Sequence, residues 1–244
     1  LFLMTRNYEE AMSIIDNLPV KSDKLKDAYQ KMAYYRGVEN YNDYKMDKAV
    51  LFFEKSLKYP NSKSIEALCY YWEADIANQQ SNYDKSIALL NQFLPMSSLV
   101  STEHSDKINT GTGNYLQGYN YYKKKDFTNA SLYFQKAVAA LKLDNNATNK
   151  QQVFPDAEIR LADCYFMQKQ YKSAAQYYND VITANAQGAD YALYQRSIID
   201  GLNGSYNDKI AGMKTLVTRF PNSAFADDAM MQIGNTYMAQ EKDD

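Results

Sequence analysis

The sequence predicts an all-α fold, a right-handed superhelical solenoid built from helix-turn-helix hairpins. Small and aromatic residues recur at helical spacing within pairs of short segments. The pairs themselves recur along the 244 residues. Since 45% of the residues are hydrophobic, stacked hairpins have enough apolar side chains to share one continuous core.

The clearest hairpin lies in the middle of the chain. Its first segment carries a small and an aromatic residue three apart, Gly118 and Tyr121. Its second segment carries Ala130, Phe134 and Ala137, spaced by four and three, and a polar, lysine-rich turn separates the two segments. This spacing places each set on one helical face, and the small residues allow the helices to approach closely.

The same register recurs before and after this hairpin. The residues equivalent to Gly118, in order, are Gly37, Ala74, Gly118, Ala162, Ser197 and Gly234, and they are separated by 37, 44, 44, 35 and 37 residues. We therefore predict a single repeat array over residues 1–244, with a half repeat at 1–20, repeats at about 21–62, 63–96, 111–142, 155–187 and 188–223, and a half repeat at 224–244. The half repeats, the first residue Leu1 and the acidic tail Glu241–Asp244 lead us to expect a piece of a longer protein.

This pattern resembles the tetratricopeptide repeat, whose signature places a small residue and an aromatic on the first helix, Ala, aromatic and Ala on the second, and a proline near the end. The resemblance implies a solenoid whose first helices line a concave surface that binds proteins or peptides. The repeat is usually about 34 residues long, so every interval here is longer. The two longest contain the polar connectors 95–113 and 143–155, whose extra residues either extend helices, form loops that carry binding, or are simply tolerated insertions.

Two joints between repeats support a narrower resemblance. Lys58–Ser62 and Arg219–Ser223 each carry an aromatic residue, then Pro-Asn-Ser, between a second helix and the following first helix. The proline stops one helix and the Ser or Asn can cap the next. These joints resemble those of bacterial envelope proteins, including outer-membrane assembly lipoproteins and periplasmic partners of cell-wall complexes. This implies a periplasmic or outer-membrane-associated location in preference to a cytoplasmic one.

The resemblance also predicts which side chains face a partner. Carried over to the first helices position by position, the candidate groove residues are Tyr34, Tyr41, Tyr71, Asp75, Tyr115, Tyr119, Tyr122, Asp163, Phe166, Tyr194 and Asn235. Tyrosine suits a binding surface because its ring gives apolar contact and its hydroxyl gives a hydrogen bond. The alternative is that these rings are core residues. Because the corresponding positions lack the basic residues of the family's carboxylate clamp, we do not expect chaperone-tail binding.

The sequence contains few candidates for catalysis. Its one histidine, His104, lies in a polar connector, and there is no glycine-rich phosphate loop. Cys69 and Cys164 lie in different repeats, so we expect neither a disulfide nor a metal pair between them. With 27 basic and 29 acidic residues, the chain lacks the excess positive charge that nucleic-acid binding requires. We expect no enzyme activity, cofactor or metal, and no apolar run is long enough to span a bilayer.

We therefore predict a non-enzymatic scaffold that recognises a protein or peptide, within a larger and possibly cell-envelope assembly. A second hypothesis is a carbohydrate-binding module, which requires two or three exposed and coplanar groove tyrosines. A third is an architectural spacer whose groove binds nothing. The sequence does not identify the partner.

Overall fold

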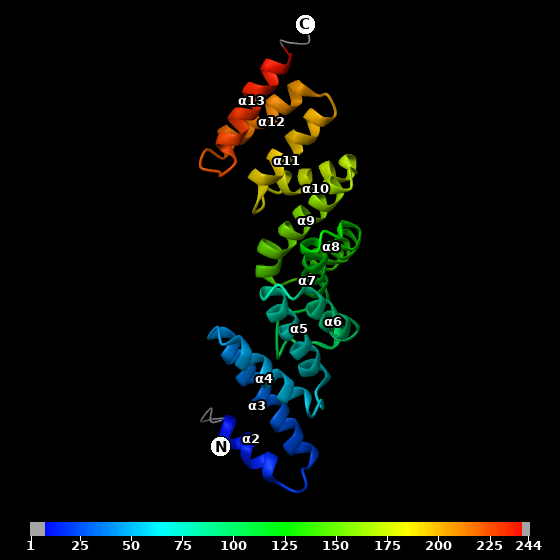
Figure 1. The fold of residues 1–244 in the computed structure, drawn as a ribbon, viewed down its shortest axis with the longest axis vertical. Coiled ribbons are helices and arrows are strands. Elements are labelled where there is room, and N and C mark those ends of the chain that lie inside the picture. The colour runs from blue at the N-terminus through cyan, green and yellow to red at the C-terminus, as the bar shows by residue number, and fades with distance from the viewer. Residues whose placement is uncertain (1–7, 241–244) are drawn as a thin grey trace. The chain divides into compact units, whose positions relative to one another are not determined.

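The computed structural model describes residues 8–240, and every regular element within them is a helix (Figure 1). The predicted all-α class is therefore confirmed for these residues. The ends of the two predicted half repeats, residues 1–7 and 241–244, lie outside the described residues, and so does the acidic tail. The chain forms two compact units, one ending at Lys124 and the other beginning at Lys125. We describe each unit by itself.

The first unit contains six α-helices and one short 3-10 helix within its described residues. They are α2 (Tyr8–Asn17), α3 (Asp23–Asn42), α4 (Met46–Leu57), α5 (Lys63–Gln79), α6 (Tyr83–Phe93), η1 (Leu94–Leu99) and α7 (Thr110–Lys123). Helix α3 packs against α4, and α5 packs against α6. Each is a first helix followed by its second helix, as the spacing of small and aromatic residues predicts.

Polar side chains set where several first helices begin. Ser22 and Ser62 each accept a hydrogen bond from the backbone N–H three residues later, at the starts of α3 and α5. At the start of α7, Asn109 and Thr112 form a reciprocal capping box. The Pro-Asn-Ser joint after α4 thus ends one helix and caps the next, as predicted.

Close helix approach in the first unit depends on a glycine. A Cβ atom at Gly37 would lie 2.5 Å from the Phe53 Cε1 atom, so the α4 ring occupies the space that a side chain on α3 would need. Phe53 is fully buried beside Ala49 and Tyr34. The predicted role of Gly37 as the small residue at a helix crossing is confirmed.

The second unit repeats this arrangement. Its described helices are α8 (Phe127–Lys142), the π-helical turn η2 (Asn149–Val153), α9 (Phe154–Met167), α10 (Tyr171–Thr183), α11 (Ala189–Leu202), α12 (Tyr206–Arg219) and α13 (Ala226–Gln240). Helix α9 packs against α10, and α11 packs against α12. Ala162, Ala174 and Tyr178 are buried at the first of these contacts, where the repeat spacing predicts them.

The two long connectors are partly helical. The 3-10 helix η1 lies in the first, and α7 begins at Thr110, so residues 110–113 belong to a first helix. The π-helical turn η2 leads directly into α9. Much of the extra length in both long intervals therefore extends helices.

Within residues 8–240, no helix combines the length and apolarity needed to cross a membrane.

Candidate functional site

Two candidate residues of the first unit, Tyr41 on α3 and Asp75 on α5, belong to a cluster of aromatic and polar side chains. The Tyr41 and Trp72 ring centroids lie 4.6 Å apart. The Tyr41 hydroxyl donates to Asp75 Oδ2 at 2.5 Å, and the Gln79 amide donates to the same carboxylate oxygen at 2.7 Å. Burial, followed by the hydrogen bond to Asp75, raises the pKa of Tyr41, so this hydroxyl is protonated at neutral pH.

Two tyrosines predicted for the groove are involved in core packing. Tyr34 is only 2% exposed, so it does not present a ring to a partner. It lies among the core residues near Phe53, because the face of α3 that carries it is covered by neighbouring helices. Tyr71 is half-buried, with its ring 5.2 Å from that of Phe93 on α6. Burial raises the pKa of Tyr71.

The three candidate tyrosines of α7, which are Tyr115, Tyr119 and Tyr122, are each half-buried and pack edge to face. The rings of Tyr115 and Tyr119 are 5.0 Å apart at an interplanar angle of 76°, and those of Tyr119 and Tyr122 are 6.4 Å apart at 64°. Because the rings are strongly tilted to one another, they do not form the common plane that the carbohydrate hypothesis requires.

In the second unit, Asp163 is a buried anchor and not a surface carboxylate. It is 5% exposed, and its Oδ1 atom accepts from the hydroxyls of Tyr178 at 2.6 Å and Tyr191 at 2.9 Å. Its Oδ2 atom accepts from Arg160 Nη1 at 2.8 Å. Burial raises the pKa of Asp163, while the Tyr178 hydrogen bond and the Arg160 charge act in the opposite direction. Asp163 is therefore buried, with both oxygens engaged within the protein, whereas the sequence predicts it on the groove surface.

The other three candidates of this unit differ in exposure. Phe166 is half-buried, with its ring 5.5 Å from that of Tyr171 on the adjacent second helix. Tyr194 is half-buried, with its ring 5.6 Å from that of Phe225. Asn235 is exposed on α13. Tyr194 and Asn235 are therefore accessible first-helix positions.

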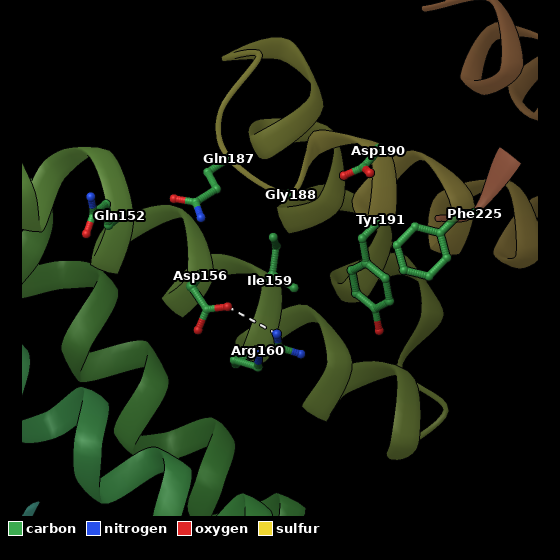
Figure 2. Close-up of a pocket in the computed structure, with 9 residues that line it drawn as sticks. All are labelled: Gln152, Asp156, Ile159, Arg160, Gln187, Gly188, Asp190, Tyr191 and Phe225. Atoms are coloured by element: carbon green, nitrogen blue, oxygen red, sulfur yellow. Dashed lines mark hydrogen bonds and ion pairs between the residues drawn. The ribbon is translucent and has the colours of Figure 1, made fainter. Parts of the chain in front are cut away.

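An open cavity of about 430 Å³ is lined in part by Arg160 and Tyr191, two residues that also donate hydrogen bonds to Asp163 (Figure 2). The lining comes from η2, α9, the segment before α11, the start of α11 and the segment before α13, through Gln152, Asp156, Ile159, Arg160, Gln187, Gly188, Asp190, Tyr191 and Phe225. In Figure 2, Tyr191 and Phe225 form one side, and Gln152 and Asp156 lie on the other. First helices therefore supply most of this cavity.

The local sequence explains how the cavity is shaped. Gly188 precedes α11 with a φ of +80°, a conformation that L side chains rarely adopt, and a Cβ there would lie 2.6 Å from Ile159 Cδ1. Arg160 lies four residues after Asp156 and three before Asp163, so both carboxylates hold it on one helical face. These ion-pair spacings were readable in the sequence, although the cavity itself was not.

The two cysteines and the histidine lie elsewhere in the described residues. Cys69 and Cys164 are buried free thiols, and burial raises the pKa of Cys164 to about 12. His104 Nδ1 lies 2.9 Å from Ser64 Oγ at the start of α5, and that oxygen also accepts from the Ser101 backbone N–H. This contact attaches the connector to α5. Among residues 8–240, no three His, Cys, Asp or Glu side chains form a metal-binding group.

Comparison with known proteins identifies the repeat. Models of the tetratricopeptide repeat match residues 112–140, which cover most of α7 and α8, and residues 156–187, which cover most of α9 and α10. Comparison with curated proteins finds no significant match.

Several solved structures share the fold. YrrB, described as a TPR protein with an unusual peptide-binding site, is 15% identical with a TM-score of 0.65, covering 92% of this chain and 98% of its own. Pseudomonas aeruginosa PilF is 15% identical with a TM-score of 0.59, covering 95% and 92%. PilW, described as a type IV pilus biogenesis factor, is 18% identical with a TM-score of 0.56, covering 94% and 93%. Residues 112–140 and 156–187 therefore match the tetratricopeptide repeat, and the chain shares the helical-solenoid fold of these solved structures.

Proposed function

We propose that this chain is a non-enzymatic scaffold that binds a protein or peptide partner through the accessible surface of its first helices. The observation that carries the proposal is the open cavity of the second unit, which is lined by α9, α11 and the segment before α13. Its volume of about 430 Å³ is within the range of about 300 to 1,000 Å³ typical of ligand pockets. Aromatic, amide and charged side chains line it together, which suits recognition of a polypeptide segment.

The fold comparisons support the same proposal. YrrB is described as having a peptide-binding site. PilW is described as a pilus biogenesis factor. These descriptions, with the Pro-Asn-Ser joints, support a place in a bacterial cell-envelope assembly, at the periplasmic face or at the outer membrane. We propose further that residues 1–244 form a single repeat array. Its contact residues for the partner include Tyr41, Tyr194 and Asn235.

Site-specific photo-cross-linking tests the proposal. A photoreactive phenylalanine analogue replaces Tyr194 on α11 or Asn235 on α13, and in matched controls it replaces Asn179 on α10 or Thr215 on α12, both exposed on second helices. After irradiation in extract of the source cells, we expect the same protein to be cross-linked at both first-helix positions and at neither control. Equal labelling at all four positions, or none at Tyr194 and Asn235, would contradict the proposal. Circular dichroism of each variant confirms that it is folded.

A further inference from the structure

The cavity of the second unit has a charge arrangement that selects among ligands. Its acidic residues are Asp156 and Asp190, and its basic residue is Arg160. Arg160 is held between two carboxylates, with Nη2 3.1 Å from Asp156 Oδ1 and Nη1 2.8 Å from Asp163 Oδ2. The positive charge of Arg160 is therefore largely compensated within the protein.

Asp190 differs from these paired groups. Its Oδ2 atom accepts a hydrogen bond of 2.6 Å from the neutral Ser223 hydroxyl. Among the ion pairs of residues 8–240, none involves Asp190. The cavity therefore contains a fixed negative charge that has no counter-ion within the described chain, and a cation of the partner would be attracted to it.

Two aromatic rings complete this side of the cavity. The Tyr191 and Phe225 ring centroids are 5.3 Å apart with an interplanar angle of 54°, and Tyr191 follows Asp190 at the start of α11 (Figure 2). The Tyr191 hydroxyl donates to Asp163, which fixes its ring in place. Aromatic faces carry a negative electrostatic potential that attracts ammonium and guanidinium groups.

We propose that this cavity binds the cationic side chain of a lysine or arginine in the partner polypeptide. The alkyl part of that side chain packs against Tyr191 and Phe225, and its charged end approaches Asp190. This inference rests on the proposed function, because the residue belongs to the partner that the scaffold binds. The cavity should therefore prefer a cation to a carboxylate. A carboxylate would have to bind Arg160, which Asp156 and Asp163 already hold.

Nuclear magnetic resonance titration of the ¹⁵N-labelled chain tests this assignment. The probe is Nα-acetyl-lysine N-methylamide. The matched probes are the norleucine derivative, which has a similar alkyl chain without the charge, and the glutamate derivative. We expect saturable shifts of the Gly188, Tyr191 and Phe225 amides with the lysine probe. We expect binding of the norleucine probe to be about tenfold weaker, a difference of about 1.4 kcal/mol, and no saturation with the glutamate probe.

A charge-neutralising variant provides the second measurement. Asp190→Asn keeps an oxygen that can accept from Ser223 and should weaken lysine-probe binding about tenfold. Asp208→Asn makes the same change at an exposed position of α12 outside the cavity, and should leave binding unchanged. The dispersion of the amide spectrum shows whether each variant is folded.

Several results would overturn the inference: equal binding of the lysine and norleucine probes, preference for the glutamate probe, absence of saturable shifts, or equal binding by wild type and Asp190→Asn. These results are separate from the cross-linking outcome. A partner that cross-links at Tyr194 and Asn235, with a cavity that ignores the lysine probe, leaves the scaffold function standing and removes only the cationic-residue assignment. If the lysine probe binds but no partner is cross-linked, the cationic preference of the cavity stands and the scaffold function is contradicted.

Discussion

Asp75 in the first unit and Asp163 in the second occupy the same repeat position, since each follows the small alanine of its first helix, yet they have different surroundings. Asp75 is half-buried and accepts from Tyr41 on the preceding first helix and from Gln79 on its own helix. Asp163 is buried and accepts from Tyr178, Tyr191 and Arg160. The repeat position therefore determines which point of the helix backbone carries the aspartate. Neighbouring side chains determine whether its carboxylate lies near the surface or is buried.

The two surroundings also produce different surfaces. In the first unit, Tyr41 packs against Trp72 and forms hydrogen bonds with Asp75 and Gln79. In the second unit, the groups around Asp163 hold Arg160 and Tyr191 at the edge of an open cavity. Similar helical hairpins thus support a hydrogen-bonded cluster of side chains in one unit and an open pocket in the other.

Removing the buried carboxylate gives the largest expected effect. Asp163→Ala removes the acceptor of two tyrosine hydroxyls and one of the two carboxylates that hold Arg160, and we expect it to destabilise the second unit by about 3 to 5 kcal/mol. Asp75→Ala, at the half-buried equivalent position, should cost about 1 to 2 kcal/mol. Urea unfolding followed by near-ultraviolet circular dichroism measures both. Equal losses for the two variants would break the comparison.

The free energy of unfolding should depend on pH through the buried carboxyl group of Glu73. Burial, with the nearby Glu54, raises the pKa of Glu73 from 4.5 to about 7, so the native state binds this proton more tightly than the unfolded state. The resulting stability is present below pH 4.5 and is lost as the pH rises to about 7. A displacement of this size corresponds to about 3 kcal/mol.

Glu73→Gln should therefore be more stable than wild type at pH 8 and similar to it at pH 4.5. Urea unfolding at pH 4.5, 6 and 8 measures this, with Glu103→Gln as a control at an exposed site of the same unit. Glu158, whose pKa burial and Asp180 raise to about 7, should show the same behaviour in the second unit. If wild type and Glu73→Gln respond identically to pH, the pKa of Glu73 is the same in the folded and unfolded states.

Glycine substitution compares equivalent helix crossings. Gly37→Ala would place a Cβ 2.5 Å from a Phe53 ring atom, and the resulting overpacking should cost about 1 to 3 kcal/mol. At Gly234, the equivalent residue of α13, an added Cβ meets no described heavy atom within 4 Å. Gly234→Ala should therefore stabilise the helix by about 0.5 to 1 kcal/mol. Thermal unfolding measures both, and a shift of the same sign in both variants would contradict the assigned packing.

Removing one hydroxyl gives the smallest expected effect. Tyr41→Phe eliminates the hydrogen bond to Asp75 and keeps the ring against Trp72, so we expect a loss of about 0.5 to 1.5 kcal/mol. A double-mutant cycle with Asp75→Asn isolates this contact. Additive effects in that cycle would show that the hydroxyl and the carboxylate do not stabilise each other.

The sequence by itself determined the all-α class and most helix positions, because small and aromatic residues at helical spacing can form hydrophobic faces only in hairpins that pack together. It also identified Gly37, Ala74 and Ala162 as crossing residues. Two helices that cross closely require a small side chain at the crossing point, so a glycine or alanine in the sequence directly indicates the crossing.

Only the tertiary structure decided which candidate residues are accessible. Tyr34 and Tyr41 lie on the same helix, but contacts from distant segments bury the first and leave the second half-buried. The cavity likewise combines Asp156, Asp190 and Phe225, which are more than 30 residues apart in sequence. Exposure and pocket shape depend on side chains brought together from different helices, and no local spacing specifies that arrangement.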